Sequence, residues 1–144
     1  MIETDIIYKQ PDEREYEEVK LMVEDFWLDN ADMKREQFRI ISENRKVIAF
    51  ARIKEYEDAT ELGTLGVAKE YRGMGYGSKM VLHLLKQAKD DVYIVTTMFR
   101  FNANLGFVLV ENYPDSISKK VNTCAKDYHV DEPYFVMKWE KRTI

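Results

Sequence analysis

One short stretch limits the fold of this 144-residue chain more than any other. A strand-like segment at residues 61–68 leads through a turn into glycines that alternate with bulkier residues, Gly73, Gly75 and Gly77. Helically spaced apolar residues follow this turn. A strand that feeds a helix in this way is the first half of a crossover, which favours helices layered on a sheet. Ligands prefer the ends of such strands, so we expect the functional site at this turn.

Hydrophobic periodicity predicts strands and helices on both sides of this turn. Strands are expected at residues 4–9, 38–42, 47–53, 61–68, 92–97, 107–110 and 134–139, and helices at 12–28, at 31–36 and from Gly77 to Ala88. Asn44 suits the turn of a hairpin between the second and third strands. The sequence therefore predicts one α/β (α+β) domain over residues 1–144. Its sheet should be mixed and largely antiparallel, with six to seven strands and about four helices.

Composition and charge exclude several classes of protein. The net charge of −4 argues against a nucleic-acid-binding protein, which needs a basic surface. The longest apolar run, residues 47–51, is far shorter than the roughly 18 residues of a membrane span. Acidic Glu3 and Asp5 stand where a secretory signal is basic, so a cytoplasmic protein without membrane contact is expected. Cys124 is the only cysteine and the two histidines lie far apart, so neither a disulfide nor a metal site is expected.

The glycine-rich turn has the composition of a phosphate-binding loop. Glycines there let successive backbone amides converge on an anion, and the following helix adds its positive N-terminal dipole. The stretch fits neither the P-loop pattern nor the dinucleotide-binding pattern G-x-G-x-x-G. The alternative is a glycine-rich helix entry that binds no ligand.

Residues 72–77, Arg-Gly-Met-Gly-Tyr-Gly, match the [QR]-x-x-G-x-[GA] signature of the GCN5-related N-acetyltransferase (GNAT) superfamily, which the chain resembles over nearly its whole length. The resemblance implies the GNAT-like acyl-CoA acyltransferase fold and acetyl-CoA as the cosubstrate. It also implies which residues bind this cosubstrate. Pantetheine would lie along Leu65, Gly66 and Val67, and the phosphates would bind Arg72, Gly73, Met74, Gly75, Tyr76, Gly77 and Ser78.

The acceptor amine must lose a proton before it can attack, which costs about 4.6 kcal/mol at pH 7 for a pKa near 10.4. Glu61 precedes Arg72 by eleven residues, a spacing similar to that of the glutamate base in histone acetyltransferases of the superfamily. The resemblance therefore implies that Glu61 is the base. The alternative is a charged residue that ends a loop, and Glu55, Glu57 and Asp58 are weaker candidates for the base.

The acid that protonates the departing thiolate is less well defined. In the family a tyrosine commonly does this, within a pattern like F-Y-x-x-x-G-F. Residues 101–107 match this pattern except that Asn102 stands at the tyrosine position. Asn102 can hydrogen-bond the cofactor or a water but cannot donate a proton as a phenol does. Either the thiolate leaves unprotonated, or Tyr128 or Cys124 is the acid.

The predicted function is therefore transfer of the acetyl group of acetyl-CoA to a primary amine, by direct attack in a ternary complex. The acceptor could be an amino acid, a small amine or a peptide or protein amine. Residues 1–36 carry a net charge of −7, so Asp25, Asp29 and Asp32 could attract a cationic acceptor, or they simply form a solvated face. Lys119 and Lys120 could receive a carboxylate, or they are exposed lysines on a short helix.

Two other functions remain open. The missing tyrosine supports a non-catalytic module that binds and senses acyl-CoA. A nucleotide-phosphate-binding protein would need a base-recognition pocket that nothing in the sequence suggests. The oligomeric state also stays open, a homodimer included.

Overall fold

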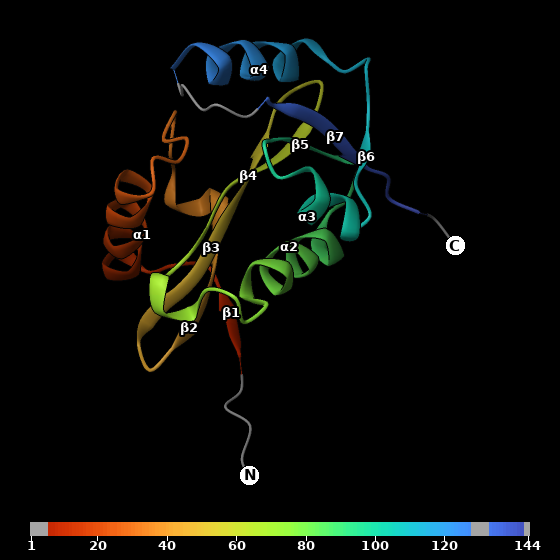
Figure 1. Ribbon diagram of the computed structural model, residues 1–144. Helices are drawn as coiled ribbons and strands as arrows, with labels where there is room; N and C mark the ends of the chain where they lie inside the picture. Colours follow the sequence, from red (N-terminus) through yellow and green to blue (C-terminus); the bar gives the residue numbers. More distant parts are fainter. Residues whose placement is uncertain (1–5, 128–132, 143–144) are drawn as a thin grey trace. The chain divides into compact units, whose positions relative to one another are not determined.

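The computed structural model describes residues 6–127 and 133–142 (Figure 1). Its strands form one seven-stranded sheet in the order β1-β2-β3-β4-β5-β7-β6, with β4 parallel to β5 and the other recorded pairs antiparallel. The strands are β1 Ile7–Lys9, β2 Phe38–Glu43, β3 Lys46–Glu55, β4 Thr60–Val67, β5 Val92–Thr96, β6 Val108–Leu109 and β7 Phe135–Trp139. The α-helices are α1 Glu13–Asp25, α2 Tyr76–Gln87, α3 Phe99–Asn104 and α4 Asp115–Asp127. The predicted mixed, largely antiparallel sheet with four helices is confirmed.

The chain forms two compact units. Unit 1 consists of residues 1–52 and 64–84, and unit 2 consists of residues 53–63 and 85–144. In the part of the chain that the structure describes, no helix is long and apolar enough to cross a membrane.

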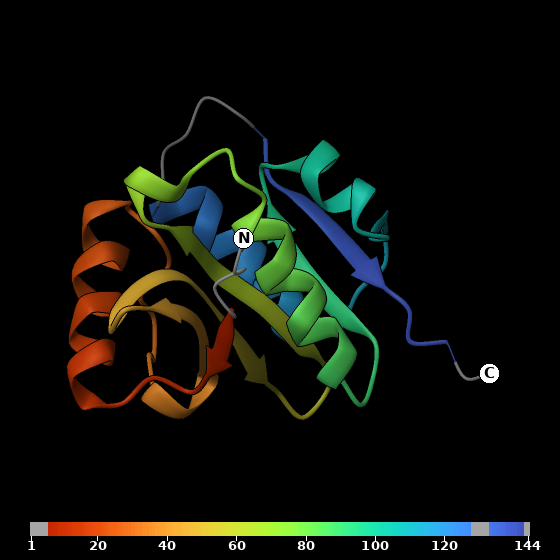
Figure 2. The ribbon, with the colours of Figure 1, turned by 90° about the horizontal axis from the view of Figure 1, so that it is seen from below.

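In unit 1, α1 packs along the hairpin of β2 and β3 (Figure 2). Asp12 starts the helix, because its side chain accepts a hydrogen bond from the Glu15 amide while Glu15 returns one to the Asp12 amide. Val19 and Val23, one turn apart, then enter a core with Phe38 and other apolar residues of the hairpin. The hairpin turns at Asn44 and its successor, both with positive φ, as the sequence predicts.

The end of α1 is unusual. The amides of Trp27 and Leu28 bond back to Glu24 and Val23, which is the Schellman pattern, with Trp27 at the left-handed position that usually holds glycine. The Trp27 side chain is 82% exposed. The short helix expected at residues 31–36 is wrong: Asp32 has a φ of +52°, so the chain cannot continue as a helix there, and only a 3-10 turn at Arg35–Gln37 forms.

A fully buried arginine holds several segments of unit 1 together. Arg52 on β3 pairs with Asp29 at 3.1 Å, and its other nitrogens donate to Gln37 and to the Thr64 hydroxyl. Thr64 lies on β4 with a φ of +51°, an uncommon conformation for a β-branched residue, and its hydroxyl donates in turn to the Asp29 carbonyl. A buried charge must be paired and hydrogen-bonded, so Arg52 fixes both the loop after α1 and the backbone of β4.

In unit 2, β7 lies between β5 and β6, and both pairs are antiparallel. The β3–β4 turn is tied to the start of α4, because the Ser116 amide donates to Asp58. The segment after β7 is tied to the start of β5, because the Lys141 amide donates to Asp91.

Gly66 in β4 is required by a packed aromatic ring. A Cβ at this position would lie 2.3 Å from Cζ of Phe50, which is fully buried. Gly63 on the same strand is different, because a Cβ there would meet only Glu61 Oε2, at 3.4 Å. A glycine in a strand suggests that another group comes close to the backbone. At Gly66 that group is the Phe50 ring of the protein's own core.

This contrast predicts different stabilities for two identical substitutions. Gly66→Ala should lower the free energy of unfolding by about 1–3 kcal/mol, because the Phe50 ring must shift in a close-packed core. The matched control Gly63→Ala should change it by less than about 0.5 kcal/mol, because its methyl group makes an ordinary contact. Urea unfolding of both variants measures the difference, and equal stabilities would contradict the assignment of Gly66 to packing.

Candidate functional site

The glycine-rich loop between β4 and α2 lies in unit 1 and presents its backbone openly. Gly73 and Gly75 have φ values of +78° and +86°, in the region that glycine adopts without strain. A Cβ at either position would meet no atom within 4 Å. These glycines are therefore required by backbone conformation, and the loop has room for a ligand beside its main chain.

The loop ends at the N-terminus of α2. The Lys79 amide donates to the Gly75 carbonyl at 3.1 Å. The amides of Tyr76, Gly77 and Ser78 come before this bond, so the helix itself offers them no acceptor. Three such amides and the helix dipole favour an anion at this end of the helix.

Two contacts within unit 1 fix Arg72, the first residue of the motif. Its Nε donates to the Val67 carbonyl at 3.0 Å, and its guanidinium lies 4.6 Å from the centre of the Phe26 ring. The side chain is nevertheless exposed. Its charge is thus positioned beside the loop and remains available to an anion.

The end of β4 offers mainly backbone to a ligand. Leu65 and Val67 are half-buried, and Gly66 between them is buried against Phe50. A strand presents successive residues to opposite faces, so Leu65 and Val67 share a face that Gly66 does not.

Glu61 lies in unit 2 and is buried, with 2% exposure. Its Oε1 accepts a hydrogen bond from the Tyr56 hydroxyl at 2.8 Å, and its Oε2 lies 3.2 Å from Lys120 Nζ on α4. Its backbone pairs with Tyr93 of β5 in the parallel register. Glu61 is therefore a buried carboxylate held by two donors, rather than a charged residue that ends a loop in solvent.

The two adjacent lysines of α4 have different environments. Lys119 is exposed, but the Lys120 side chain is only 11% exposed and its charge faces Glu61. The expectation of two exposed lysines is therefore wrong for Lys120.

Near the start of α4, hydrogen bonds from Ser116 lower the pKa of the Asp58 carboxyl.

Asn102 is 2% exposed in α3 and carries an unsatisfied acceptor. Its Nδ2 donates to the Met98 carbonyl at 2.9 Å and to Thr96 Oγ1 at 3.3 Å. A carbonyl oxygen can only accept, so this contact fixes which end of the amide is the oxygen. Among the described residues, no donor reaches Asn102 Oδ1. Asn102 Oδ1 is thus a fixed and buried hydrogen-bond acceptor.

The structure describes one of the other two candidates for the acid. Cys124 is buried in α4, with 5% exposure. Tyr128 lies outside the described residues.

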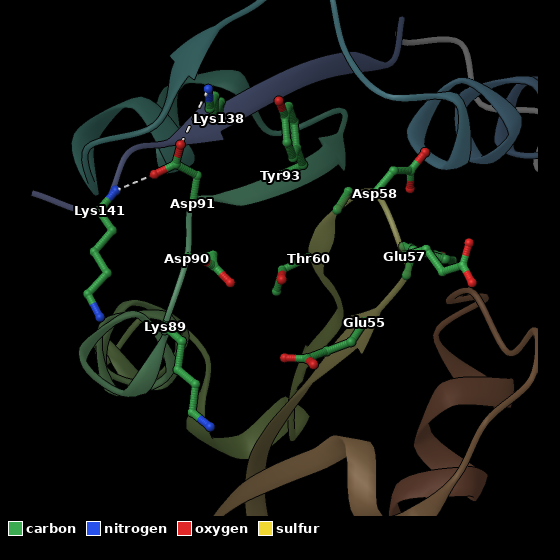
Figure 3. Close-up of a pocket in the computed structure, with 12 residues that line it drawn as sticks. Glu55, Glu57, Asp58, Thr60, Lys89, Asp90, Asp91, Tyr93, Lys138 and Lys141 are labelled. Atoms are coloured by element: carbon green, nitrogen blue, oxygen red, sulfur yellow. Dashed lines mark hydrogen bonds and ion pairs between the residues drawn. The ribbon is translucent and has the colours of Figure 1, made fainter.

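A polar cavity of about 620 Å³ lies in unit 2, around the starts of β4 and β5 (Figure 3). Its charged lining carries Glu55, Glu57, Asp58, Asp90, Asp91, Lys89, Lys138 and Lys141, and Tyr56, Ala59, Thr60 and Tyr93 complete it. Lys138 pairs with Asp91 at 3.4 Å. Figure 3 shows the carboxylates of Asp90 and Glu55 pointing toward the open centre from opposite walls.

The acidic residues near the end of α1 do not act as a set. Asp29 is 13% exposed and pairs with Arg52, whereas Asp25 and Asp32 are exposed. Of these three residues, only Asp25 and Asp32 can attract a cation from solution.

Sequence reasoning missed two residues that organise these surroundings. Arg52 interrupts an otherwise apolar strand at residues 47–53, which is a signal of a buried, paired charge. Tyr56 sits in a polar turn, and nothing in the sequence indicates its bond to Glu61.

The model of the "Acetyltransferase (GNAT) family" matches residues 4–108. No curated protein sequence matches the chain significantly.

Among solved structures, N-acetylglutamate synthase from Neisseria gonorrhoeae, complexed with coenzyme A and N-acetyl-glutamate, superposes with a TM-score of 0.80 at 14% identity. The match covers 99% of this chain and 36% of that one, so this chain spans about a third of the synthase. Rv2747 from Mycobacterium tuberculosis, in complex with CoA and NLQ, has a TM-score of 0.73 at 15% identity, over 94% and 99% of the two chains. Escherichia coli ElaA has a TM-score of 0.68 at 17% identity, over 94% and 100%.

These identities are low, so the structures show a shared fold, while the family match covers most of the chain. The family match confirms the resemblance seen in the sequence, and the solved structures confirm the fold that it implied. The chain belongs to the acetyltransferase (GNAT) family of acetyl-CoA-dependent N-acetyltransferases.

Proposed function

We propose that this chain transfers the acetyl group of acetyl-CoA to the primary amine of an amino acid, by direct attack in a ternary complex. The observation that carries the proposal is the open, left-handed glycine loop at the N-terminus of α2. A loop of this kind binds phosphates through its backbone, and the family signature spans the same residues.

Residues of the loop and of β4 would hold the cosubstrate. The amides from Gly73 to Ser78 and the Arg72 guanidinium would bind its phosphates, and the backbone of residues 65–67 would pair with its pantetheine arm. Asn102 Oδ1, fixed and without a donor among the described residues, would accept a hydrogen bond from it. Acetyl-CoA supplies an acetyl group that is already activated as a thioester.

Glu61 would take the proton from the acceptor ammonium, directly or through an ordered water. Lys120 pairs with Oε2 and the Tyr56 hydroxyl donates to Oε1, so the carboxylate is held in a fixed orientation, which is the geometric requirement for a positioned base. Asn102 cannot donate a proton as a phenol does, so the departing thiolate would take its proton elsewhere or leave unprotonated.

An amino-acid acceptor is supported by the synthase complex with N-acetyl-glutamate and by charges in this chain. Exposed Asp25 and Asp32 would attract the ammonium, and exposed Lys119 would attract the carboxylate. The alternative, an acyl-CoA sensor without activity, is distinguished by turnover: release of free thiol from acetyl-CoA with a panel of amino acids, polyamines and peptides.

The cosubstrate loop can be tested at Gly75. Gly75→Val should weaken CoA binding at least tenfold, about 1.4 kcal/mol, because a β-branched residue resists a φ of +86° and the loop must rearrange. Arg45→Val is the matched control, since Arg45 also has positive φ but lies in the β2–β3 turn. Calorimetry of both folded variants checks this, and a Gly75→Val variant with wild-type affinity would remove the loop from the site.

The proposed base can be tested at Glu61. Glu61→Gln should lower kcat by about 10² to 10⁴ and leave CoA affinity nearly unchanged. The variant leaves Lys120 buried without its counter-ion, so stability must be measured too. In the double variant Glu61→Gln/Lys120→Met the charge imbalance is gone, so stability should recover while kcat stays low. A single variant within threefold of wild-type kcat would assign the base to another residue.

Recognition of the acceptor carboxylate can be tested at Lys119. Lys119→Met should raise KM for the best amino acid about threefold to tenfold and leave KM for its decarboxylated amine unchanged, because only the amino acid has a carboxylate to lose the contact. Steady-state kinetics with the two acceptors provides the measurement. Equal effects on both acceptors would mean that Lys119 does not recognise the carboxylate.

A further inference from the structure

Tyr56 connects the buried Glu61 carboxylate to the polar cavity of unit 2. Its hydroxyl donates to Glu61 Oε1 at 2.8 Å, and the same residue lines the cavity of about 620 Å³. Glu61 itself is 2% exposed and is not among the lining residues. Tyr56 therefore both contacts the Glu61 carboxylate and belongs to the wall of the cavity.

The surroundings of Glu61 leave its two oxygens with different partners. Oε2 faces Lys120 Nζ at 3.2 Å, and a lysine ammonium has only protons to donate. Oε1 faces Tyr56, whose hydroxyl can both donate and accept. A proton bound by Glu61 can therefore leave through Tyr56 but not through the ammonium of Lys120.

The cavity is suited to receive a proton. Its size and polar lining admit water. Four acidic residues are among those that line it, Glu55, Glu57, Asp58 and Asp90. In the close-up, Asp90 and Glu55 point into the open centre, where they can accept protons from water (Figure 3).

We propose that Tyr56 is a relay residue that clears the proton from Glu61 after each turnover and passes it to water in the cavity. The inference rests on the proposed role of Glu61 as the base. An N–H bond of the acceptor ammonium breaks and an O–H bond forms on Glu61. Once Glu61 is protonated, the Tyr56 hydroxyl turns its own proton from Glu61 toward a water in the cavity. The Glu61 proton then moves to the Tyr56 oxygen while the original hydroxyl proton moves to that water. Glu61 returns to the carboxylate, Tyr56 stays neutral, and a buffer base or a lining carboxylate takes the proton from the water.

The test compares Tyr56→Phe with Tyr93→Phe in the full chain. Tyr56→Phe keeps the ring and removes the relay, so kcat should fall about 10- to 100-fold, with KM for acetyl-CoA unchanged. Tyr93→Phe removes a hydroxyl from the same cavity and should retain wild-type kcat. Thermal unfolding of both variants shows that each is folded.

Buffer rescue separates a relay from a structural contact. In Tyr56→Phe, kcat should rise with the concentration of imidazole at constant pH and ionic strength, because a small base in the cavity can take the proton in place of Tyr56. Wild-type kcat should not depend on imidazole. The variant Tyr56→His, which restores a proton-carrying side chain, should recover part of the rate without added imidazole.

The outcomes separate this inference from the proposed function. Wild-type kcat in Tyr56→Phe together with a strongly reduced kcat in Glu61→Gln would overturn the relay and keep the base. Wild-type kcat in both variants would overturn both. A slow Tyr56→Phe variant that imidazole does not rescue would show that Tyr56 only orients Glu61, which also overturns the relay.

Discussion

The Glu61 side chain, almost completely buried beside the charge of Lys120, is the constraint on which unit 2 depends. An uncompensated buried charge costs several kcal/mol, so the fold must bring donors to it. Lys120 comes from α4 and Tyr56 from the β3–β4 turn, and the Asp58–Ser116 bond ties the same turn to the start of the same helix. Both elements are thereby fixed around the residue that we propose as the base, and a preorganised base needs little rearrangement during the reaction.

Much of the fold could be predicted because its signals are local. The apolar stripe of α1, the Asn44 hairpin and the alternation of strands follow from periodicity and turn chemistry within single segments. The predicted helix at residues 31–36 failed for a tertiary reason. Asp29 is drawn to the buried Arg52, and the chain turns through a left-handed Asp32 instead of forming a helix.

The same distinction between local and long-range signals applies to the candidate site. The glycine loop could be identified from the sequence because glycine spacing reports backbone conformation directly, as the φ values of Gly73 and Gly75 show. Side-chain partners depend on residues distant in the chain, so the sequence could not distinguish Lys120 from Lys119 or connect Tyr56 with Glu61. Gly66 illustrates the same limit, since only the structure shows that Phe50 requires it.

The exposed tryptophan at the end of α1 has a practical consequence. The chain has two tryptophans, and they belong to different units. Trp27 lies in unit 1 and its side chain is 82% exposed. Trp139 lies in unit 2 and is half-buried beside Gly106. Their environments differ in polarity, so their fluorescence emission should differ in wavelength. Trp27 directly follows Phe26, whose ring lies under Arg72 of the glycine loop. The chain thus carries one intrinsic optical reporter in each unit, and a single Trp-to-Phe replacement isolates either signal.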